Sequence, residues 1–187
     1  MTDLDILGIS GSLRAGSLNT ALLKAAQKHA PAGVAIDVYD GLAELPYYDG
    51  DLDTEETLSV RVRELRDRIR AADGVLFATP EYNYSIPGGL KNLIDWASRP
   101  SATSSLLHKP VAIMGAAPTN FGTVRAQLAL RQVFVWTHSD VVVKPEVMAF
   151  RAHERFDEAG NLTDDDTIKL VTSLVDALAA KIRNAAK

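Results

Sequence analysis

The sequence contains no cysteine among its 187 residues. Disulfide bonds, thiolate-bound zinc, iron–sulfur clusters and thiol nucleophiles are therefore excluded, and a chain without cysteine fits the reducing cytoplasm. No apolar run approaches the ~20 residues that a membrane helix needs. Residues 1–6 carry two aspartates where a signal peptide would carry lysine or arginine. We therefore expect a cytoplasmic protein with no membrane contact.

The sequence also lacks a large excess of either basic or acidic residues. Lysine and arginine together number 20, aspartate and glutamate 24, and the formal net charge is -4. Without a basic block, a nucleic-acid-binding surface is not expected. A chain of this length buries one substantial core and is too short for two ordinary domains. We expect a single domain over residues 1–187 with a site for a small molecule.

Five short apolar runs, separated by helix-like stretches, define the predicted architecture. They cover residues 6–10, 34–38, 74–79, 110–114 and 141–143. Repeated strand–helix alternation predicts an α/β fold in which helices cover both faces of a parallel sheet. Pro145 makes the fifth strand short or places it at an edge. The 3.6-residue spacing of apolar side chains predicts helices over residues 58–69 and 168–182, the second with Thr163 as its N-cap.

The loop after the first predicted strand, residues 11–19, suits a phosphate group. It is rich in glycine and serine and opens into a helix, so main-chain N–H groups, the hydroxyls of Ser12 and Ser17 and the helix dipole converge. Arg14 adds a guanidinium that bonds phosphate oxygens in pairs. A simple capped turn, with Ser17 as N-cap and Arg14 in solvent, is the alternative. A triphosphate-binding P-loop is disfavoured because Ser17 stands where that motif requires lysine.

The loop after the third predicted strand, residues 80–96, suits a flat ring with polar edges. Prolines stiffen it, and Tyr82 or Tyr84 is expected to pack against the ring while Asn83 bonds its edge. Alternatively, the tyrosines pack on neighbouring loops and Glu81 pairs with a surface arginine. If the strand order is 2-1-3-4-5, the two loops flank the crevice where the order reverses, and FMN is its natural occupant.

Both loops carry motifs that resemble those of the NADPH-dependent FMN reductase family of flavodoxin-like proteins. G-S-L-R-x-x-S-x-N occupies residues 11–19, and P-E-Y-N-x-S-x-P-G-x-L-K-N-x-I-D-W occupies residues 80–96. The resemblance runs along essentially the whole chain. It implies a flavodoxin-like three-layer sandwich with a five-stranded parallel sheet of order 2-1-3-4-5 and helices on both faces.

The resemblance also implies which residues contact FMN. Four polar residues of the first loop would hold the phosphate, and residues 81–84 would line the isoalloxazine, largely through main-chain groups. A turn after the fourth strand would supply a third contact, which we expect from its main chain because alanine replaces serine there. The implied cofactor-binding residues are Ser12, Leu13, Arg14, Ala15, Gly16, Ser17, Leu18, Asn19, Pro80, Glu81, Tyr82, Asn83, Tyr84 and Ala117.

The activity implied by the resemblance is hydride transfer from NAD(P)H to FMN, followed by reduction of a small acceptor such as a quinone, free flavin, azo dye or chromate. Ping-pong turnover is expected because one crevice serves both substrates. The cofactor carries the chemistry, so no catalytic side chain is expected. The four histidines lack metal-ligand spacing, so no metal site is expected. A flavodoxin-like electron carrier and an FMN-binding redox regulator are the alternatives.

Residues 124–136 place apolar side chains around more than one face of a predicted helix. A helix packed only on its own sheet needs one apolar stripe, so the surplus predicts contact with another subunit. Arg125 and Glu146 are candidates for the polar rim of that contact, and the resemblance implies dimers or tetramers. The apolar residues are Val124, Leu128, Leu130, Phe134, Val135 and Trp136.

Overall fold

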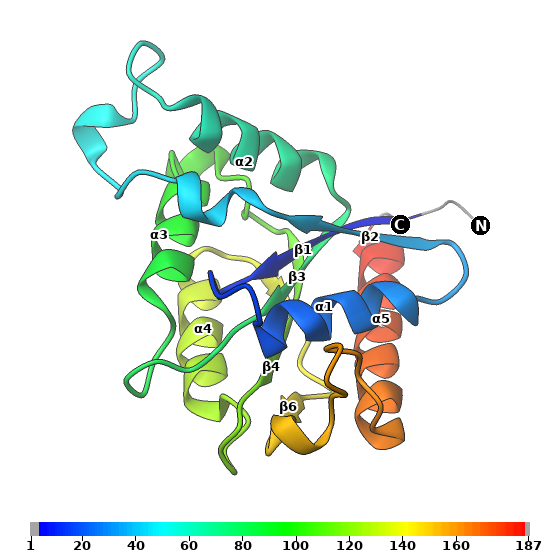
Figure 1. The fold of residues 1–187 in the computed structure, drawn as a ribbon. Coiled ribbons are helices and arrows are strands. Elements are labelled where there is room, and N and C mark those ends of the chain that lie inside the picture. The colour runs from blue at the N-terminus through cyan, green and yellow to red at the C-terminus, as the bar shows by residue number, and fades with distance from the viewer. Residues whose placement is uncertain (1–3, 186–187) are drawn as a thin grey trace.

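A parallel sheet with β1 (Leu4–Ser10) near its centre forms the middle of the computed structural model, which describes residues 4–185. Residues 1–3 and 186–187, the ends of the predicted domain, lie outside the described residues. The strand order is β2-β1-β3-β4-β5 and every pairing is parallel, which confirms the predicted order. Figure 1 labels β1 to β4 and β6 of this sheet. The other strands are β2 (Val34–Tyr39), β3 (Gly74–Ala78), β4 (Pro110–Ala116), β5 (Asp140–Val141) and β6 (Val147–Ala149).

The outer position beside β4 corrects the predicted strand count. It is filled by two short strands rather than one: β5 pairs with the start of β4, and β6 pairs with its end. Pro145 lies between them and has no N–H to donate, so a continuous ladder along β4 is interrupted there. The expectation of a short fifth strand was correct, but β6 was missed.

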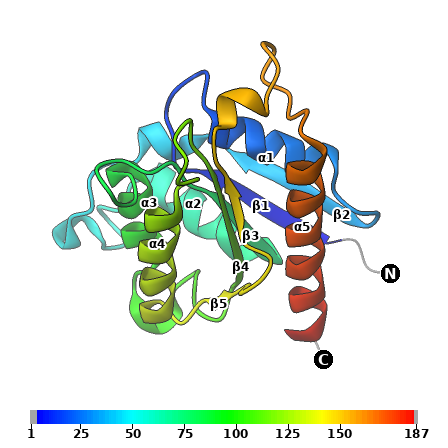
Figure 2. The same ribbon diagram turned by 90° about the horizontal axis from the view of Figure 1, so that it is seen from below.

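Helices cover both faces of the sheet, so the predicted three-layer sandwich is confirmed. Alternate residues of β1 face opposite sides: Ile6 belongs to the core under α1 and α5, whereas Leu7 and Ile9 belong to the core under α2, α3 and α4. Figure 2 shows α1 and α5 on one side of the sheet and α3 and α4 on the other. The helices are α1 (Leu18–Lys28), α2 (Val60–Ala71), α3 (Gly88–Ala97), α4 (Val124–Trp136) and α5 (Asp165–Ala185).

Two helix starts differ from the predicted ones. α2 begins at Val60 rather than at residue 58, because the Ser59 side chain caps it. The predicted cap Thr163 of α5 is wrong: the Asp164 carboxylate accepts from the main-chain N–H of Thr167 at 2.9 Å. Hydrogen bonds from Thr167 also lower the pKa of the Asp164 carboxyl. None of the helices within residues 4–185 has the length and apolar character needed to cross a membrane.

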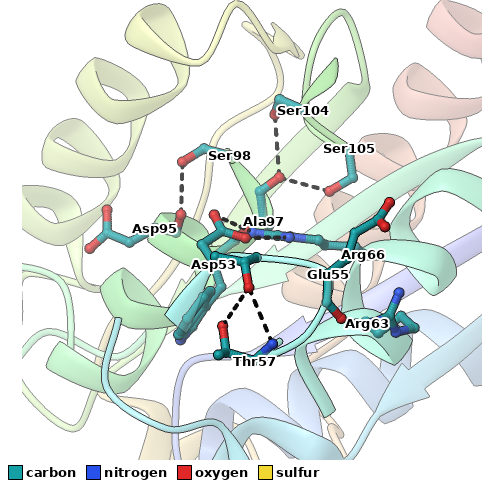
Figure 3. Close-up of polar contacts among 12 residues, drawn as sticks. Asp53, Glu55, Thr57, Arg63, Arg66, Asp95, Ala97, Ser98, Ser104 and Ser105 are labelled. Carbon is teal, nitrogen blue, oxygen red and sulfur yellow. Dashed lines mark hydrogen bonds and ion pairs between the residues drawn. The ribbon is translucent and has the colours of Figure 1, made fainter. Parts of the chain in front are cut away.

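A buried ion pair fixes the long connection between β2 and α2. Arg66 is buried on α2, bonds Asp53 through two nitrogens at 2.8 and 3.0 Å, and donates from Nε to the carbonyl of Trp96 at 2.9 Å. The Trp96 indole N–H donates to Pro46 at 2.8 Å. Figure 3 shows Arg66 beside Asp53, with serine side chains bonding the nearby Ala97 carbonyl. This network ties the connection between β2 and α2 to both α2 and α3.

Candidate cofactor-binding site

The loops after β1, β3 and β4 meet at the carboxyl edge of the sheet. The chain leaves β1 for β2 on one side, whereas β3 pairs with β1 on the other, so the loops flank the point where the strand order reverses. A cavity of about 100 Å³ lies there, called the cofactor pocket below. Its lining residues are Ser12, Arg14, Ser17, Leu18, Asn19, Pro80, Glu81, Tyr82, Ala116, Ala117 and Pro118.

Most predicted cofactor-binding residues gather in or beside this pocket. Leu13 lines a neighbouring cavity of about 280 Å³, which shares Arg14 and Tyr82 with the cofactor pocket. Ala15 and Gly16 line a third cavity, between α1 and residues 156–162. Asn83 and Tyr84 lie at the tip of the β3 loop and do not line the cofactor pocket. Ala116, the last residue of β4, and Pro118 also line the pocket. Both belong to the turn from which a third contact was predicted, although only Ala117 was named as a contact residue.

The β1 loop, residues 11–17, carries side-chain hydrogen-bond donors that can still bond a ligand. Ser17 caps α1, as the capped-turn alternative expected, by accepting from the Thr20 N–H at 3.2 Å; its own hydroxyl proton remains available. The exposed Arg14 guanidinium pairs with no carboxylate in the part of the chain that the structure describes. Ser12 Oγ lies 3.5 Å from the Tyr82 hydroxyl of the β3 loop. Arg14, Ser12 and Ser17 therefore fit a phosphate group at the start of α1.

Glycine permits the close approach of these loops. A Cβ atom at Gly11 would lie 3.0 Å from the Leu90 side chain and 3.1 Å from Pro80. A Cβ atom at Gly115 would lie 1.8 Å from the Thr123 hydroxyl, which no side chain tolerates. The pocket therefore depends on small residues at the ends of both β1 and β4.

The Asn19 side chain has a different role from the phosphate contact implied by the resemblance. Its buried carboxamide accepts from the Ala116 N–H at 2.9 Å and donates to the Ala116 carbonyl at 3.0 Å. The side chain therefore joins the start of α1 to the end of β4, across 97 residues of sequence. Only one amide hydrogen is left for a phosphate contact. Sequence spacing gave no signal for so distant a partner.

Glu81 follows the alternative interpretation of its side chain. The carboxylate forms an ion pair with Arg125 at 2.5 Å and accepts from the main-chain N–H groups of Arg125 and Ala126 at 3.0 and 3.3 Å. It thereby caps α4, whose own N-cap residue Thr123 makes no side-chain capping bond. The Glu81 side chain holds α4 in place, which leaves main-chain groups for any ligand contact.

The tip of the β3 loop is a tight two-residue turn. Tyr82 and Ser85 exchange main-chain hydrogen bonds at 3.0 and 3.1 Å, and Asn83 and Tyr84 between them have φ angles of 49° and 71°. Two successive positive φ angles are characteristic of a type I′ turn. The Tyr84 ring does not pack on the pocket; it stacks on Arg125, whose guanidinium carbon lies 4.2 Å from the ring centroid.

The main chain of Ala117 is already hydrogen-bonded. Its N–H donates to Ala149 at 3.0 Å, and its carbonyl accepts from Ala152 at 3.0 Å. The next residue, Pro118, has no N–H. Only the second lone pair of the Ala117 carbonyl oxygen is therefore available for the predicted main-chain contact.

The fold and the pocket together define a flavodoxin-like protein whose β1 loop lines a pocket at the sheet's switch point. No group of three or more histidine, aspartate or glutamate side chains within residues 4–185 is arranged to hold a metal ion. Comparison with known families matches residues 4–154 to the NADPH-dependent FMN reductases. The chain belongs to this family.

Similar proteins cover nearly the whole chain. An NAD(P)H-dependent FMN reductase of Pseudomonas aeruginosa is 45% identical over 181 residues, which is 97% of this chain and 96% of that protein. A quinone reductase of Escherichia coli is 38% identical over 181 residues, 96% of each. The solved structure of FerB, a flavoenzyme NAD(P)H:(acceptor) oxidoreductase from Paracoccus denitrificans, superposes with a TM-score of 0.87 at 35% identity, covering 97% of this chain and 98% of that one.

Proposed function

We propose that this protein is an FMN-dependent oxidoreductase that takes electrons from NAD(P)H and delivers them to a small acceptor such as a quinone, free flavin, azo dye or chromate. The observation that carries the proposal is the meeting of Ser12, Arg14 and Ser17 with the β3 loop at one pocket. Family membership and similarity to FMN and quinone reductases support it. We further propose that residues 1–187 form a single domain and that the protein is cytoplasmic.

The side chains bind and orient rather than transfer protons. Arg14, Ser12 and Ser17 would hold the phosphate, and residues 80–82 of the β3 loop would border the ring. Asn83 and Tyr84 would contribute only from the tip of that loop. Bound FMN supplies the hydride and electron chemistry. Glu81 fixes the start of α4 beside the pocket. We assign no catalytic side chain and no metal.

The test is an absorbance spectrum of the purified protein followed by anaerobic addition of NADPH, and separately of NADH. We expect a flavin spectrum that bleaches on reduction and returns when a quinone is added without any partner protein. Oxidation of NAD(P)H by the quinone without any partner protein also separates an enzyme from an electron carrier, because a carrier needs a separate reductase to receive electrons from NAD(P)H. A flavin spectrum that neither nicotinamide bleaches contradicts the proposal.

Turnover follows a ping-pong order in this proposal, because one crevice receives both the nicotinamide and the electron acceptor. Oxidised nicotinamide then leaves before the acceptor enters. Double-reciprocal plots at several quinone concentrations are expected to be parallel. Intersecting lines demonstrate a ternary complex and contradict the shared crevice.

α4 supports the proposal that the protein self-associates as a dimer or tetramer. Leu130 and Phe134 are buried against the sheet, whereas Leu128, Val135 and Trp136 are 53%, 75% and 83% exposed. The surplus apolar side chains therefore lie on the outer surface of the helix, where a second copy of the chain would cover them.

A further inference from the structure

A cavity of about 490 Å³ lies between α1 and residues 156–162, which belong to the connection between β6 and α5. Figure 2 shows this connection, drawn in orange, beside α1. We call the cavity the α1 pocket. Ser17 and Leu18 line both this pocket and the cofactor pocket, so the two adjoin at the start of α1. The volume is within the range of roughly 300–1,000 Å³ that is typical of small-molecule sites.

The two walls of the α1 pocket carry opposite charges. Lys24 and Lys28 line it from α1, whereas Asp157 and Glu158 line it from the facing loop. The Asp157 carboxylate is held within its own loop, because it accepts from the main-chain N–H and the side-chain amide of Asn161 at 2.7 and 2.9 Å. Neither lysine forms an ion pair within the part of the chain that the structure describes. The gap between the walls is therefore open to a ligand that is anionic at one end and carries hydrogen-bond donors at the other.

Small and apolar side chains form much of the remaining surface of the α1 pocket. Ala21 and Ala25 lie one turn apart on α1, and Phe156 and Leu162 pair in an antiparallel bridge on the facing loop. Phe156 is half-buried, so part of its ring is accessible to a planar molecule. The pocket thus combines apolar surface with a few charged groups, as small-molecule sites do.

The stability of α1 does not explain why a lysine stands at position 24. Lys28 and His29 lie at the carboxyl end of α1, where the helix dipole favours positive charge. Lys24 lies one turn earlier, and no carboxylate stands three or four residues from it in either direction. Because Lys24 and Lys28 are four residues apart on one face of the helix, they repel each other in the free protein. An anion bound between them would remove that repulsion.

We propose that the α1 pocket is a second ligand site, which binds a phosphorylated nucleoside. Lys24 and Lys28 form charge-assisted hydrogen bonds with a phosphate, and the planar base packs on Phe156. The ribose hydroxyls donate to the acidic wall, as they do to the acidic residue of dinucleotide-binding folds. The site lies outside the cofactor pocket and needs neither FMN nor turnover, so the inference goes beyond the proposed function.

Two ligands share this chemistry. One is a free adenine nucleotide, and the other is the adenosine end of NADPH, which carries a 2′-phosphate that NADH lacks. The shared lining at the start of α1 allows the second, since Lys24 and Lys28 lie roughly 10 and 16 Å along the helix from Ser17 at 1.5 Å per residue. Adenosine 2′,5′-bisphosphate is a probe for both.

The test titrates adenosine 2′,5′-bisphosphate, and separately adenosine, into the FMN-saturated protein in a calorimeter. Bound FMN occupies the β1 loop, so neither probe binds there. We expect the bisphosphate to bind more tightly than adenosine. Lys24→Gln should weaken binding of the bisphosphate by roughly tenfold and of adenosine by less than about threefold, as for the loss of one charge-assisted hydrogen bond. Lys144→Gln is the matched control, since Lys144 is exposed between β5 and β6 and does not line the pocket.

Ala21→Leu tests the α1 pocket by filling it. Ala21 is half-buried and lines the pocket, and leucine is nearly as good a helix former as alanine. The thermal midpoint of the variant is therefore expected to stay close to that of the wild type. Both probes should bind less tightly, because the larger side chain takes the space of the ligand.

Saturating NADP⁺ distinguishes the two sources of the ligand. If NADP⁺ prevents the bisphosphate from binding, the pocket receives the adenosine end of NADPH, and Lys24→Gln should raise the KM for NADPH and leave that for NADH unchanged. If the bisphosphate binds equally well in the presence of NADP⁺, the ligand is a free nucleotide. Both results support the site.

Two results overturn the site even if NADPH oxidation proceeds. One is that the wild type does not bind the bisphosphate, and the other is that the wild type, Lys24→Gln and Ala21→Leu bind it with equal affinity. If the protein binds no FMN, the proposed function fails, whereas comparison of the wild type with Lys24→Gln in the FMN-free protein still decides the site.

Discussion

Replacing Asn19 by alanine is expected to destabilise the fold. Replacing a side chain whose only role is to bind a phosphate would destabilise it much less. The Asn19 carboxamide is the hydrogen-bond partner of both the N–H and the carbonyl of Ala116, and its side chain is buried. Alanine leaves both main-chain groups unsatisfied. An unsatisfied buried group costs about 1–3 kcal/mol, so we expect a loss of at least about 2 kcal/mol. That loss is a large part of the roughly 5–15 kcal/mol by which native proteins are stable.

The assay is urea unfolding of the FMN-free protein, followed by circular dichroism. Arg14→Ala is the matched control, because Arg14 is exposed in the same loop and its loss is expected to change the free energy of unfolding by less than about 0.5 kcal/mol. If Asn19→Ala unfolds at the wild-type urea concentration yet binds FMN poorly, the carboxamide is a phosphate ligand and our structural assignment is wrong.

Three further predictions concern stability and assembly. Asp53→Ala leaves the Arg66 guanidinium buried without its carboxylate, so the free energy of unfolding should fall by about 3–5 kcal/mol, measured by urea unfolding; a change below about 1 kcal/mol contradicts the assignment. Burial raises the pKa of the Tyr39 hydroxyl from its ordinary 10.0 to about 12, so the folded state keeps a proton that the unfolded state loses. The free energy of unfolding of the wild type should therefore fall as the pH rises from about 10 to 12. In Tyr39→Phe, which has no hydroxyl to titrate, it should fall less steeply. Trp136→Asp puts a charge on the outer surface of α4 and should shift sedimentation toward the 20.2 kDa monomer; a wild type that already sediments as a monomer contradicts the self-association proposal.

Buried strands and glycine-rich loops were predictable because their signals are local. The continuous apolar runs of β1, β3 and β4 and the single long stripe of α5 each show one periodicity over consecutive residues. The position of the pocket followed from them, since parallel strands bring their following loops to one edge.

The missed features depend on partners far apart in sequence. Glu81 bonds Arg125 across 44 residues, and Asn19 bonds Ala116 across 97, so neither contact leaves a pattern in its own segment. β6 is three residues long, too short for a periodicity to appear. Asp164 and Thr163 are both good capping residues, and only the side-chain geometry decides between them.

The most direct test of the central claim is whether the β1 loop binds the phosphate of FMN. The measurement is the affinity of the FMN-free protein for FMN and for riboflavin, which lacks the phosphate, in the wild type and in Arg14→Ala. One charge-assisted bond contributes about 1.5–3 kcal/mol, so Arg14→Ala should weaken FMN binding by roughly ten- to a hundredfold. Riboflavin should bind both proteins equally and weakly. Equal loss of FMN and riboflavin affinity in Arg14→Ala contradicts the phosphate site.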